Sequence, residues 1–463
     1  MEKNLKTTRR EFIGKTTMAV AGLTAIPSIL SASGNRRIRG ANDRIRIGFI
    51  GVGNRGTQLM HLFMNQPGCE VAALCDVYEP YMTRNRNQIS ARYLEGNPGF
   101  IPVMGEKFSS QPKMYKDYRD LLADKTIDAV CISTPDHWHA LQTIHSIQAG
   151  KDVFVEKPLT KTIVEGRKMI EAQDASRQVV AVGLNRRGAE AYQKLAREIP
   201  AGKIGNVTIA RAARISNMSP RGIGKMKAEQ PPSNFDWDMW IGPQAYRPYQ
   251  YNIAPYWFRW WNDYSSQMGN WGVHYMDVIR WMMNEQAPVS ISAHGGNYGV
   301  DDDRDIPDTM QVTFEFGSGS MVSFSIYEAS GGALFSDGEV ELRGTKGNLY
   351  ASENGYRIIP TGRWGTESIE EEVYNVQTEM LTDGSNASST ENLVADFLKC
   401  MRTRQAPLCT LEEGHRSTSF AHLANIALAT GQRLFWDAGR EVFTNSREAN
   451  DLLHYEYRKP YAL

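Results

Sequence analysis

Several features that mark common protein classes are scarce or absent in this 463-residue chain. Its five cysteines are odd in number and include no C-x-x-C pair, which argues against a disulfide framework and against a zinc site. Lys and Arg total 52, as do Asp and Glu, so no charge surplus indicates nucleic acid or an anionic membrane as a partner. We therefore expect no metal site and no nucleic-acid binding. Cys400 and Cys409 could pair, although we expect them not to.

The N-terminal 33 residues resemble a twin-arginine export signal. The motif TRREFI (residues 8–13) precedes an uncharged, moderately apolar run at residues 16–30 and small residues at 31–33. The run is too short and too rich in Gly, Thr and Ser to be a good membrane span. We expect a mature periplasmic protein without a membrane anchor, beginning near Ser33 and followed by a linker at residues 34–43. If the stretch is instead a basic tail, the protein is expected to be cytoplasmic.

A strand, a glycine loop and a helix follow one another from residue 44. Residues 45–50 are apolar and β-branched, and they lead into Gly51-x-Gly53-x-x-Gly56 and a run with helical spacing. In this context the glycines allow a tight turn and a close approach to a pyrophosphate at the helix start. A second strand ends at Asp76, where a carboxylate can bind both ribose hydroxyls and would repel a 2′-phosphate. The pattern predicts NAD rather than NADP.

Strands and helices, including one helix expected over residues 78–94, go on alternating up to residue 184. This predicts a doubly wound parallel Rossmann sheet over residues 44–184. The pattern then changes. Two strand-like runs, residues 310–316 and 321–327, are joined by Gly-Ser-Gly and predict a hairpin. We therefore predict an α/β protein whose second part, residues 185–463, is an α+β domain with a largely antiparallel sheet. Residues 231–271, dense in Trp, Tyr and Pro, are predicted to form a long ordered loop against the cleft.

Two motifs carry groups suited to acid–base chemistry. Glu156-Lys157-Pro158 follows a predicted strand, where desolvation would favour the neutral lysine, able to exchange a proton with a substrate hydroxyl. Asn270 and His274 are spaced i, i+4 and share one face if a helix has begun there. Read alone, the lysine could be a solvated surface residue, and His274 could simply be packed.

Six motifs occur in order along residues 44–463, namely GVGNRG, LCD, STPDHWHA, VEKP, VGLNRR and GNWGVHYMDVIRW. In this combination the chain resembles the Gfo/Idh/MocA oxidoreductases, the group of glucose–fructose oxidoreductase and inositol dehydrogenase. In that family the lysine of E-K-P and a D-x-x-x-H pair act on a sugar or polyol hydroxyl as hydride passes to nicotinamide. Lys157 and His274 match, whereas Asn270 stands at the aspartate position. An asparagine can orient a hydroxyl but cannot take its proton, so the Asp-dependent part of that mechanism is not expected to carry over.

The resemblance implies a set of site residues. The expected catalytic residues are Lys157, His274 and Asn270, and the expected substrate-binding residues are Arg186, Trp271, His274 and Tyr275. The expected cofactor-binding residues are Gly51, Gly53, Asn54, Arg55, Gly56, Asp76, Thr134, Pro135, His139, Glu156, Lys157 and Asn185.

The sequence thus leads to the hypothesis of an exported NAD-dependent oxidoreductase that acts on a carbohydrate or cyclic polyol. Because little free NAD is expected outside the cytoplasm, the cofactor should stay bound and be recycled in each turnover. An alternative is a glycoside hydrolase resembling the NAD-dependent α-N-acetylgalactosaminidases, which share the glycine loop and T-P-x-x-W-H but lack the E-K-P lysine. A further alternative is a non-catalytic sugar-binding protein. A homo-oligomer, dimer or tetramer, is also expected.

Overall fold

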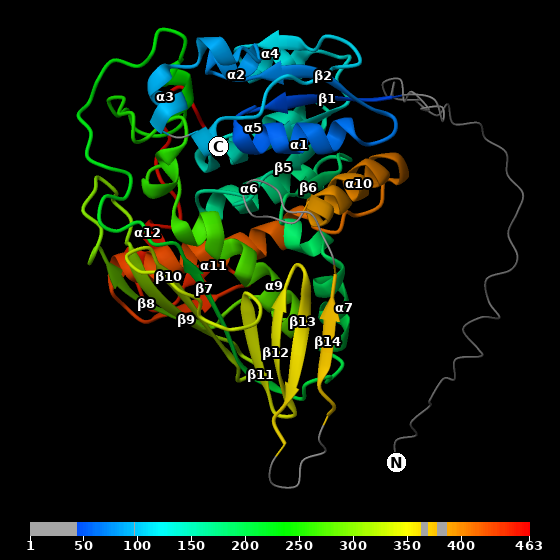
Figure 1. The fold of residues 1–463 in the computed structure, drawn as a ribbon, viewed down its shortest axis with the longest axis vertical. Helices are drawn as coiled ribbons and strands as arrows, with labels where there is room; N and C mark the ends of the chain where they lie inside the picture. The colour runs from blue at the N-terminus through cyan, green and yellow to red at the C-terminus, as the bar shows by residue number, and fades with distance from the viewer. Residues whose placement is uncertain (1–43, 97, 363–368, 377–386) are drawn as a thin grey trace, which may run out of the picture. The chain divides into compact units, whose positions relative to one another are not determined.

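The computed structural model of the chain describes residues 44–96, 98–362, 369–376 and 387–463. The expected signal (residues 1–33) and linker (residues 34–43) lie outside these ranges. Within them the chain forms two sheets with helices around and between them (Figure 1).

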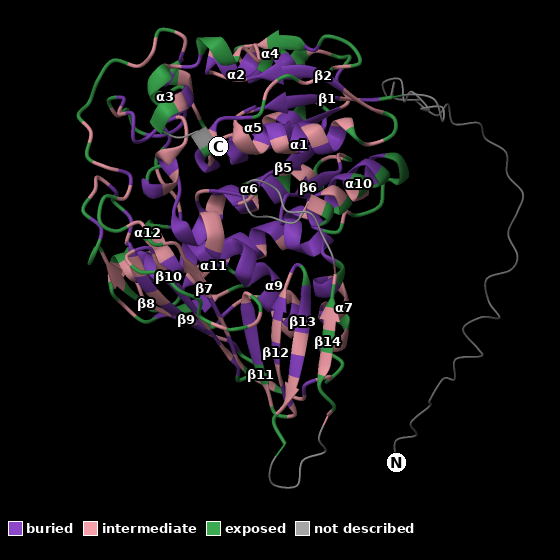
Figure 2. Cartoon of the chain, viewed as in Figure 1, coloured by how far each residue is buried: buried purple, intermediate pink, exposed green. Residues whose placement is uncertain are grey.

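The first sheet has six parallel strands in the order β3-β2-β1-β4-β5-β6, so the strand order reverses between β1 and β4. Doubly wound sheets bind ligands at such a switch point. Its central strands are buried along most of their length (Figure 2), as their Val-, Ile- and Phe-rich sequences favour for strands covered on both faces. The predicted Rossmann sheet is confirmed. Its strands are β1 (Ile45–Ile50), β2 (Cys69–Cys75), β3 (Lys113–Tyr115), β4 (Ala129–Ile132), β5 (Asp152–Val155) and β6 (Val180–Val182).

Helices on both sides cover this sheet, and one of them comes from the C-terminal part of the chain. Phe397, on α10 (Ala387–Thr403), packs edge-on against Phe63 and Phe154 with ring centroids 6.3 and 5.8 Å apart. The C-terminal chain therefore completes the N-terminal core. The crossover helices are α1 (Asn54–Met64), α4 (Tyr118–Ala123), α5 (Asp136–Gln148) and α6 (Ile163–Asp174).

The sequence suggested one helix over residues 78–94, and this prediction is wrong. The rings of Tyr78 and Tyr93 are 5.9 Å apart, whereas a continuous helix would separate these residues by about 22 Å at 1.5 Å per residue. Arg84, with a φ of +56°, turns the chain back so that the two rings meet. The segment instead forms α2 (Glu79–Met82), a 3₁₀ turn η2 (Arg86–Gln88) and α3 (Ala91–Gly96), followed by a 3₁₀ turn η3 (Pro98–Phe100).

The second sheet has ten strands in the order β14-β13-β12-β11-β7-β10-β9-β8-β15-β16. Its neighbours pair antiparallel except β7 and β10, which run parallel. The predicted hairpin is confirmed as β9 and β10, and so is the largely antiparallel sheet. Its strands are β7 (Val207–Ile215), β8 (Ser290–Gly296), β9 (Thr309–Glu315), β10 (Met321–Tyr327), β11 (Val340–Gly344), β12 (Gly347–Ser352), β13 (Gly355–Pro360), β14 (Glu372–Asn375), β15 (Leu434–Asp437) and β16 (Val442–Phe443).

Two long helices lie between the sheets (Figure 1). The helix α11 (Leu411–Thr430) contacts α6 of the first sheet and β8 of the second, and it also packs against α9 (Val273–Met283). This arrangement holds α9, which carries His274, between the two halves. Shorter helices in the second half are α7 (Glu190–Glu198), α8 (Trp237–Ile241) and α12 (Arg447–Asp451), with a 3₁₀ turn η4 (Asn185–Gly188).

The aromatic segment at residues 231–271 is largely irregular, as predicted for an ordered loop. It contains α8, a 3₁₀ turn η5 (Trp257–Trp260) and a π-helical turn η6 (Met268–Gly272). Many of its Trp and Tyr side chains belong to the same apolar cluster as the first sheet. The segment therefore packs on the N-terminal half although it follows it in sequence.

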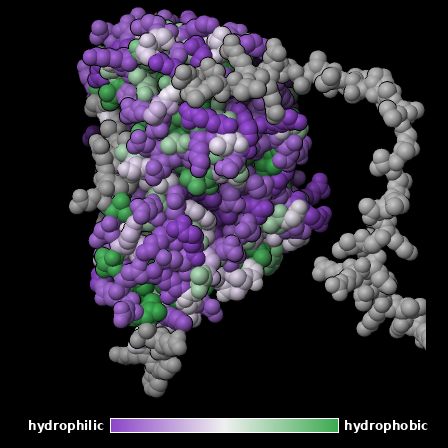
Figure 3. Space-filling model, turned by 90° about the vertical axis from the view of Figure 1, so that its right-hand side faces the viewer, coloured by the Kyte–Doolittle hydropathy of each residue, from purple (hydrophilic) through white to green (hydrophobic). Residues whose placement is uncertain are grey.

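The surface is predominantly polar on the face drawn in Figure 3, where apolar residues appear as separate spots. All five cysteines are free thiols. In the described ranges, the chain has no helix with the length and apolar character needed to cross a membrane.

Candidate active site

The glycine loop after β1 is built for close backbone contacts. Gly51 has a φ of +84°, and a Cβ there would lie 2.8 Å from the Thr134 amide nitrogen. A Cβ on Gly56 would lie 2.1 Å from the Gly51 carbonyl oxygen. Neither position can take a side chain without displacing the backbone. The α1 helix begins at Asn54, so its first N–H groups lack helical partners and suit a pyrophosphate.

Asp76 follows β2 and is tied to the same loop. Its Oδ2 accepts a hydrogen bond from the Val52 N–H (2.8 Å), and its Oδ1 accepts one from the Tyr78 N–H (2.9 Å). Burial raises the pKa of this carboxyl, and the two N–H donors act in the opposite direction. The carboxylate thus stands where the expected ribose hydroxyls would reach it.

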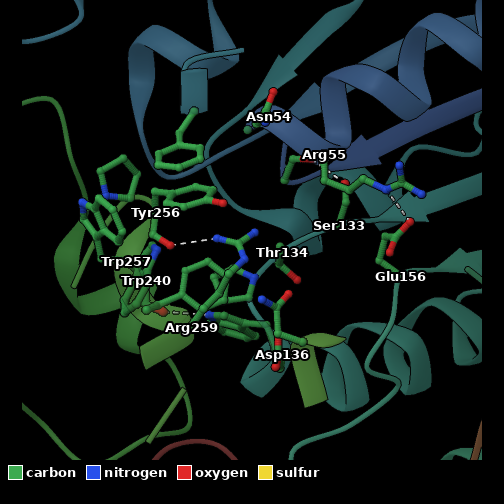
Figure 4. Close-up of a pocket in the computed structure, with 18 of the residues that line it drawn as sticks. Asn54, Arg55, Ser133, Thr134, Asp136, Glu156, Trp240, Tyr256, Trp257 and Arg259 are labelled. Atoms are coloured by element: carbon green, nitrogen blue, oxygen red, sulfur yellow. Dashed lines mark hydrogen bonds and ion pairs between the residues drawn. The ribbon is translucent and has the colours of Figure 1, made fainter. Parts of the chain in front are cut away.

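One cavity of about 540 Å³ contains both the glycine loop and the predicted catalytic groups. Its walls come from the carboxyl ends of β1, β2, β4 and β5 and from the aromatic segment, as Figure 4 shows for part of the lining. The predicted site residues that line it are Gly51, Gly53, Asn54, Arg55, Asp76, Thr134, Pro135, Glu156, Lys157, Asn185, Arg186, Asn270, Trp271 and His274.

Gly56, His139 and Tyr275 were also predicted and lie outside this lining. Gly56 lies against the loop backbone. His139 is 1% exposed, and its ring nitrogens lie 2.7 Å from the Pro158 carbonyl oxygen and 2.8 Å from that of Thr134. It ties the E-K-P turn to the loop after β4, which makes it a support for the cavity wall.

Tyr275 lies behind the wall as well. The guanidinium of Arg186 sits 5.1 Å from its ring centroid, and the ring packs against Phe324. Tyr275 therefore holds Arg186 from behind, while Arg186 itself lines the cavity.

Lys157 projects from the end of β5 and is held by the turn that carries Asn270. Its Nζ donates to the Asn270 carbonyl oxygen (2.7 Å) and lies 3.2 Å from Oδ1 of the same residue. Burial lowers the pKa of this amine from 10.5 to about 8, with the charge of Arg259 acting in the same direction and Glu156 opposing it. A lysine in this state can lose or regain its proton near neutral pH.

The helix expected at Asn270 and His274 exists, but its first turn is π-helical. Asn270 lies in η6, and His274 lies in the first turn of α9 directly after it. Such π turns are frequent at functional sites. Among the described residues, none forms a hydrogen bond with His274 Nδ1, although this atom is buried. Burial and the charges of Arg186 and Lys157 lower the pKa of His274 well below 6.5, so the imidazole is neutral.

The other polar predicted residues are fixed by ion pairs and hydrogen bonds. Arg55 Nε donates to Glu156 Oε1 (2.8 Å), which joins the glycine loop to the E-K-P turn (Figure 4). Asn185 Nδ2 donates to Glu353 Oε1 (3.0 Å). These contacts leave few polar side chains of the cavity free to move.

Sequence reasoning missed part of the aromatic wall. Phe100 stacks on Tyr256 with centroids 3.6 Å apart and an interplanar angle of 5°, and it meets Trp257 edge-on. Arg259 Nη1 donates to the Tyr256 carbonyl oxygen at 2.8 Å (Figure 4). Tryptophan and tyrosine density predicted the wall itself, but no signal pointed to Phe100 as its partner.

The prediction from sequence also missed Arg214 on β7 and Glu328 just after β10, which line the cavity from the second sheet. Strand alternation could have placed Arg214 on one face of β7, but not on the face that meets the cavity. Within the described ranges, no group of three or more His, Cys, Asp or Glu side chains is arranged to hold a metal ion.

Three family models match successive parts of this chain. "Oxidoreductase family, NAD-binding Rossmann fold" matches residues 45–184, "GFO/IDH/MocA C-terminal domain" residues 233–350, and "Oxidoreductase family, C-terminal alpha/beta domain" residues 367–463. Together they span well over half of the chain. It belongs to the Gfo/Idh/MocA family. The first sheet of this Gfo/Idh/MocA protein is an NAD-binding Rossmann domain, and its glycine loop and Asp76 fit that cofactor.

Solved structures share the whole fold at low identity. A levoglucosan dehydrogenase in complex with NADH and levoglucosan has a TM-score of 0.60 and 16% identity, over 87% of this chain and 100% of that chain. An oxidoreductase from Agrobacterium radiobacter, in complex with NAD+, L-tartaric acid and magnesium, has a TM-score of 0.60 and 14% identity, over 85% and 98%. At these identities the likeness shows the fold alone.

Curated relatives match more closely over a shorter stretch. A glycosyl hydrolase family 109 protein from Shewanella sp. (strain W3-18-1) is 34% identical over 136 residues, which are 29% of this chain and 27% of that protein. One from Shewanella baltica (strain OS185) is 31% identical over 183 residues, 37% and 38% of the two chains. The match thus spans well under half the length of these relatives.

Proposed function

We propose that this Gfo/Idh/MocA protein is an NAD-dependent oxidoreductase that acts on a hydroxyl of a carbohydrate or cyclic polyol. In this proposal NAD stays bound and is recycled in each turnover, because the hydride taken from one sugar is given either to a second sugar or back to the first. The observation that carries the proposal is that Lys157, Asn270 and His274 line the same cavity as the glycine loop and Asp76. Nicotinamide chemistry supplies the reversible acceptance of a hydride from an alcohol carbon.

Lys157 is the proposed acid–base group. Its pKa of about 8 lets the neutral amine accept the proton of a substrate hydroxyl and return it in the reverse direction. Asn270 accepts hydrogen bonds from the amine with its carbonyl oxygen and its side chain, and thereby orients the lone pair of the neutral amine towards the cavity. This role requires no proton transfer, which is consistent with an asparagine at that position.

His274 is the proposed second polar contact to the same hydroxyl-bearing substrate. Its neutral ring has one nitrogen without a partner among the described residues, and it therefore offers a hydrogen bond to a ligand. Arg186 and Trp271 complete the proposed substrate end. The flat faces of Trp257 and Trp260 in the aromatic wall suit the stacking of sugar rings.

The proposal that NAD is retained rests on the N-terminal sequence and on an aromatic contact at the cavity wall. A twin-arginine signal would export the protein already folded and loaded, into a periplasm with little free NAD. The Phe100–Tyr256 stack joins the loop after α3 to the aromatic segment at the cavity wall. Such a clasp would slow cofactor release. A homo-oligomeric assembly remains part of the proposal.

A redox-neutral glycoside hydrolase is the second candidate, favoured by the glycosyl hydrolase family 109 relatives at 31–34% identity. Such an enzyme would oxidise a sugar carbon transiently, cleave the glycosidic bond by elimination, add water across the resulting double bond, and then reduce the sugar again. In this chain Lys157 would serve in the first proton transfer, although the α-N-acetylgalactosaminidases lack that lysine.

Product analysis separates the two candidates. Purified protein is incubated with glycosides, free sugars and inositols, and the products are weighed by mass spectrometry. A product two mass units lighter than its substrate supports net oxidation, whereas a released aglycone with an unoxidised sugar supports hydrolysis. Lys157→Met should abolish either activity while the protein keeps its cofactor. Tyr298→Ala, a change at an exposed residue outside the cavity lining, should leave it unchanged.

A further inference from the structure

Arg214 is a partly buried arginine of the cavity lining. Among the residues that the structure describes, no carboxylate forms an ion pair or a hydrogen bond with its guanidinium, and its Nε is buried without any partner. By contrast, the fully buried arginines of the described residues each pair with an acid at 2.5–2.8 Å, namely Arg186 with Glu339, Arg187 with Asp277, Arg280 with Glu413 and Arg304 with Glu328.

The guanidinium of Arg214 is nonetheless held in a defined place. It lies 3.7 Å from the ring centroid of Trp271, and both residues line the cavity. Trp271 packs in turn against His274, with centroids 6.1 Å apart. Arg214 is therefore one ring away from the imidazole that is proposed to contact substrate.

The carboxylate of Glu328 acts on the charge of Arg214 but is already engaged by other partners. Glu328 Oε2 accepts from Trp260 Nε1 (2.8 Å) and pairs with Arg304 Nη1 (2.6 Å). Arg186 has its charge matched by Glu339, whereas Arg259, like Arg214, forms no ion pair with a carboxylate of the described residues. This end of the cavity thus holds more than one arginine charge without a close counter-ion. A cation that is partly removed from water without a counter-ion is costly, and a ligand oxyanion would remove that cost.

We propose that Arg214 binds a negatively charged group on the substrate, so that the sugar or polyol carries a carboxylate or a sulfate ester. This deepens the proposed function and rests on it. A guanidinium presents its Nε and Nη donors side by side, which matches the two oxygens of such a group.

Calorimetric binding to the NAD-loaded protein tests the proposal. The probes are glucose, galactose and mannose, each compared with its uronate, its 6-sulfate and its 6-phosphate. A uronate or a 6-sulfate should bind about tenfold or more tightly than its uncharged parent, which is the effect of one charged hydrogen-bond pair. Comparison of the two monoanions distinguishes a carboxylate from a sulfate ester.

Arg214→Met should remove this preference while the affinity for the uncharged parent changes little, because methionine still covers Trp271. Arg214→Lys should keep part of it. The matched control is Arg211→Met. Arg211 lies on the same strand and also covers an aromatic ring, Phe335 (5.4 Å), but it faces the other side of the sheet and pairs with Glu341.

Several results would overturn the proposal. These are equal affinity of the wild type for acids and parents, no binding of any acid in the panel, tightest binding of a 6-phosphate, and a preference that survives in Arg214→Met. A fall in NAD affinity in Arg214→Met would assign the residue to the cofactor instead. If acids bind through Arg214 but no sugar reduces the bound cofactor, the acid site stands and the oxidoreductase proposal fails.

Discussion

At the level of single residues, the fold shifts the pKa of the Lys157 amine into the range needed for proton transfer. Burial brings its pKa down to about 8, whereas burial and neighbouring cations keep His274 neutral. One group can therefore exchange a proton near neutral pH, and the other can only donate or accept a hydrogen bond. This difference gives the two residues separate pH signatures.

The first prediction concerns that pH dependence. Lys157 is protonated below about pH 8, so the rate of sugar oxidation should rise about tenfold per pH unit below that value and level off above it. Stopped-flow measurement of the reduced-nicotinamide band in single turnovers gives the profile. Lys157→Met should lose at least about a hundredfold in rate together with this limb. A flat wild-type profile would return Lys157 to a structural role.

Asp76 gives the second prediction. Asp76→Asn keeps an oxygen for the Val52 or Tyr78 N–H but loses the charge. NAD binding should weaken by about 1–3 kcal/mol, the value of charged hydrogen bonds, and the gap between NAD and NADP should narrow. Titrations of apo-protein with both cofactors measure this. Equal wild-type affinity for NAD and NADP would contradict the role given to Asp76.

The sequence correctly located those site residues whose position follows from the backbone. Gly51 and Asp76 directly follow buried strands, and such residues lie at the carboxyl edge of a parallel sheet. The sequence could not show whether a side chain near the cavity faces the cavity or the packed interior. His139 and Tyr275 are adjacent to lining residues yet point into the packing behind them. Arg214 looked like an ordinary strand residue because the face it occupies depends on tertiary packing.

At the scale of elements, the aromatic segment connects the two halves across the cavity. Phe100 belongs to the N-terminal half and Tyr256 to the segment that follows the first strand of the second sheet, and their stacking closes one side of the cleft. We infer that this contact opens when the cofactor leaves.

The third prediction follows from that contact. Phe100→Ala should speed NAD release by about three- to tenfold, since aromatic pairs add about 0.5–1.5 kcal/mol beyond their buried area. Release is followed by trapping the freed cofactor with an excess of a second dehydrogenase. Tyr246→Ala, at an exposed position of the same segment, is the control and should release NAD at the wild-type rate. Unchanged release in Phe100→Ala would exclude the clasp.

Sequence patterns predicted the elements whose periodicity is local. The βα units and the hairpin of β9 and β10 appear where the pattern places them. The prediction of one helix over residues 78–94 failed because the path of this segment depends on a contact between tyrosines that are distant in sequence. The parallel pairing of β7 with β10 was likewise invisible, since a long excursion through the aromatic segment separates the two strands.

At the scale of the whole molecule, a buried charge network joins α9, α11 and the turn that carries Asn185 and Arg186. Asp277, three residues after His274, pairs with Arg187 (2.8 Å), and Arg187 also pairs with Glu413 of α11 (2.7 Å). The network therefore fixes His274 relative to the cofactor side of the cavity.

The fourth prediction concerns this network. Asp277→Ala should lower the free energy of unfolding by about 3–5 kcal/mol, because it leaves the Arg187 guanidinium buried with a weaker counter-charge. Urea unfolding followed by tryptophan fluorescence measures the change. As a control, Asp337→Ala breaks an exposed pair with Arg357 and should cost no more than about 1 kcal/mol. Similar losses in both variants would contradict the role of the network.

The proposed enzyme keeps its NAD and uses it on a sugar or polyol. Protein purified from the exporting host and exchanged extensively into cofactor-free buffer provides the test. Addition of an oxidisable sugar should raise the reduced-nicotinamide absorbance without added NAD, and denaturation should release close to one NAD(H) per chain. A protein that arrives without cofactor, and that turns over only when millimolar NAD is supplied, would show that the cofactor is not retained.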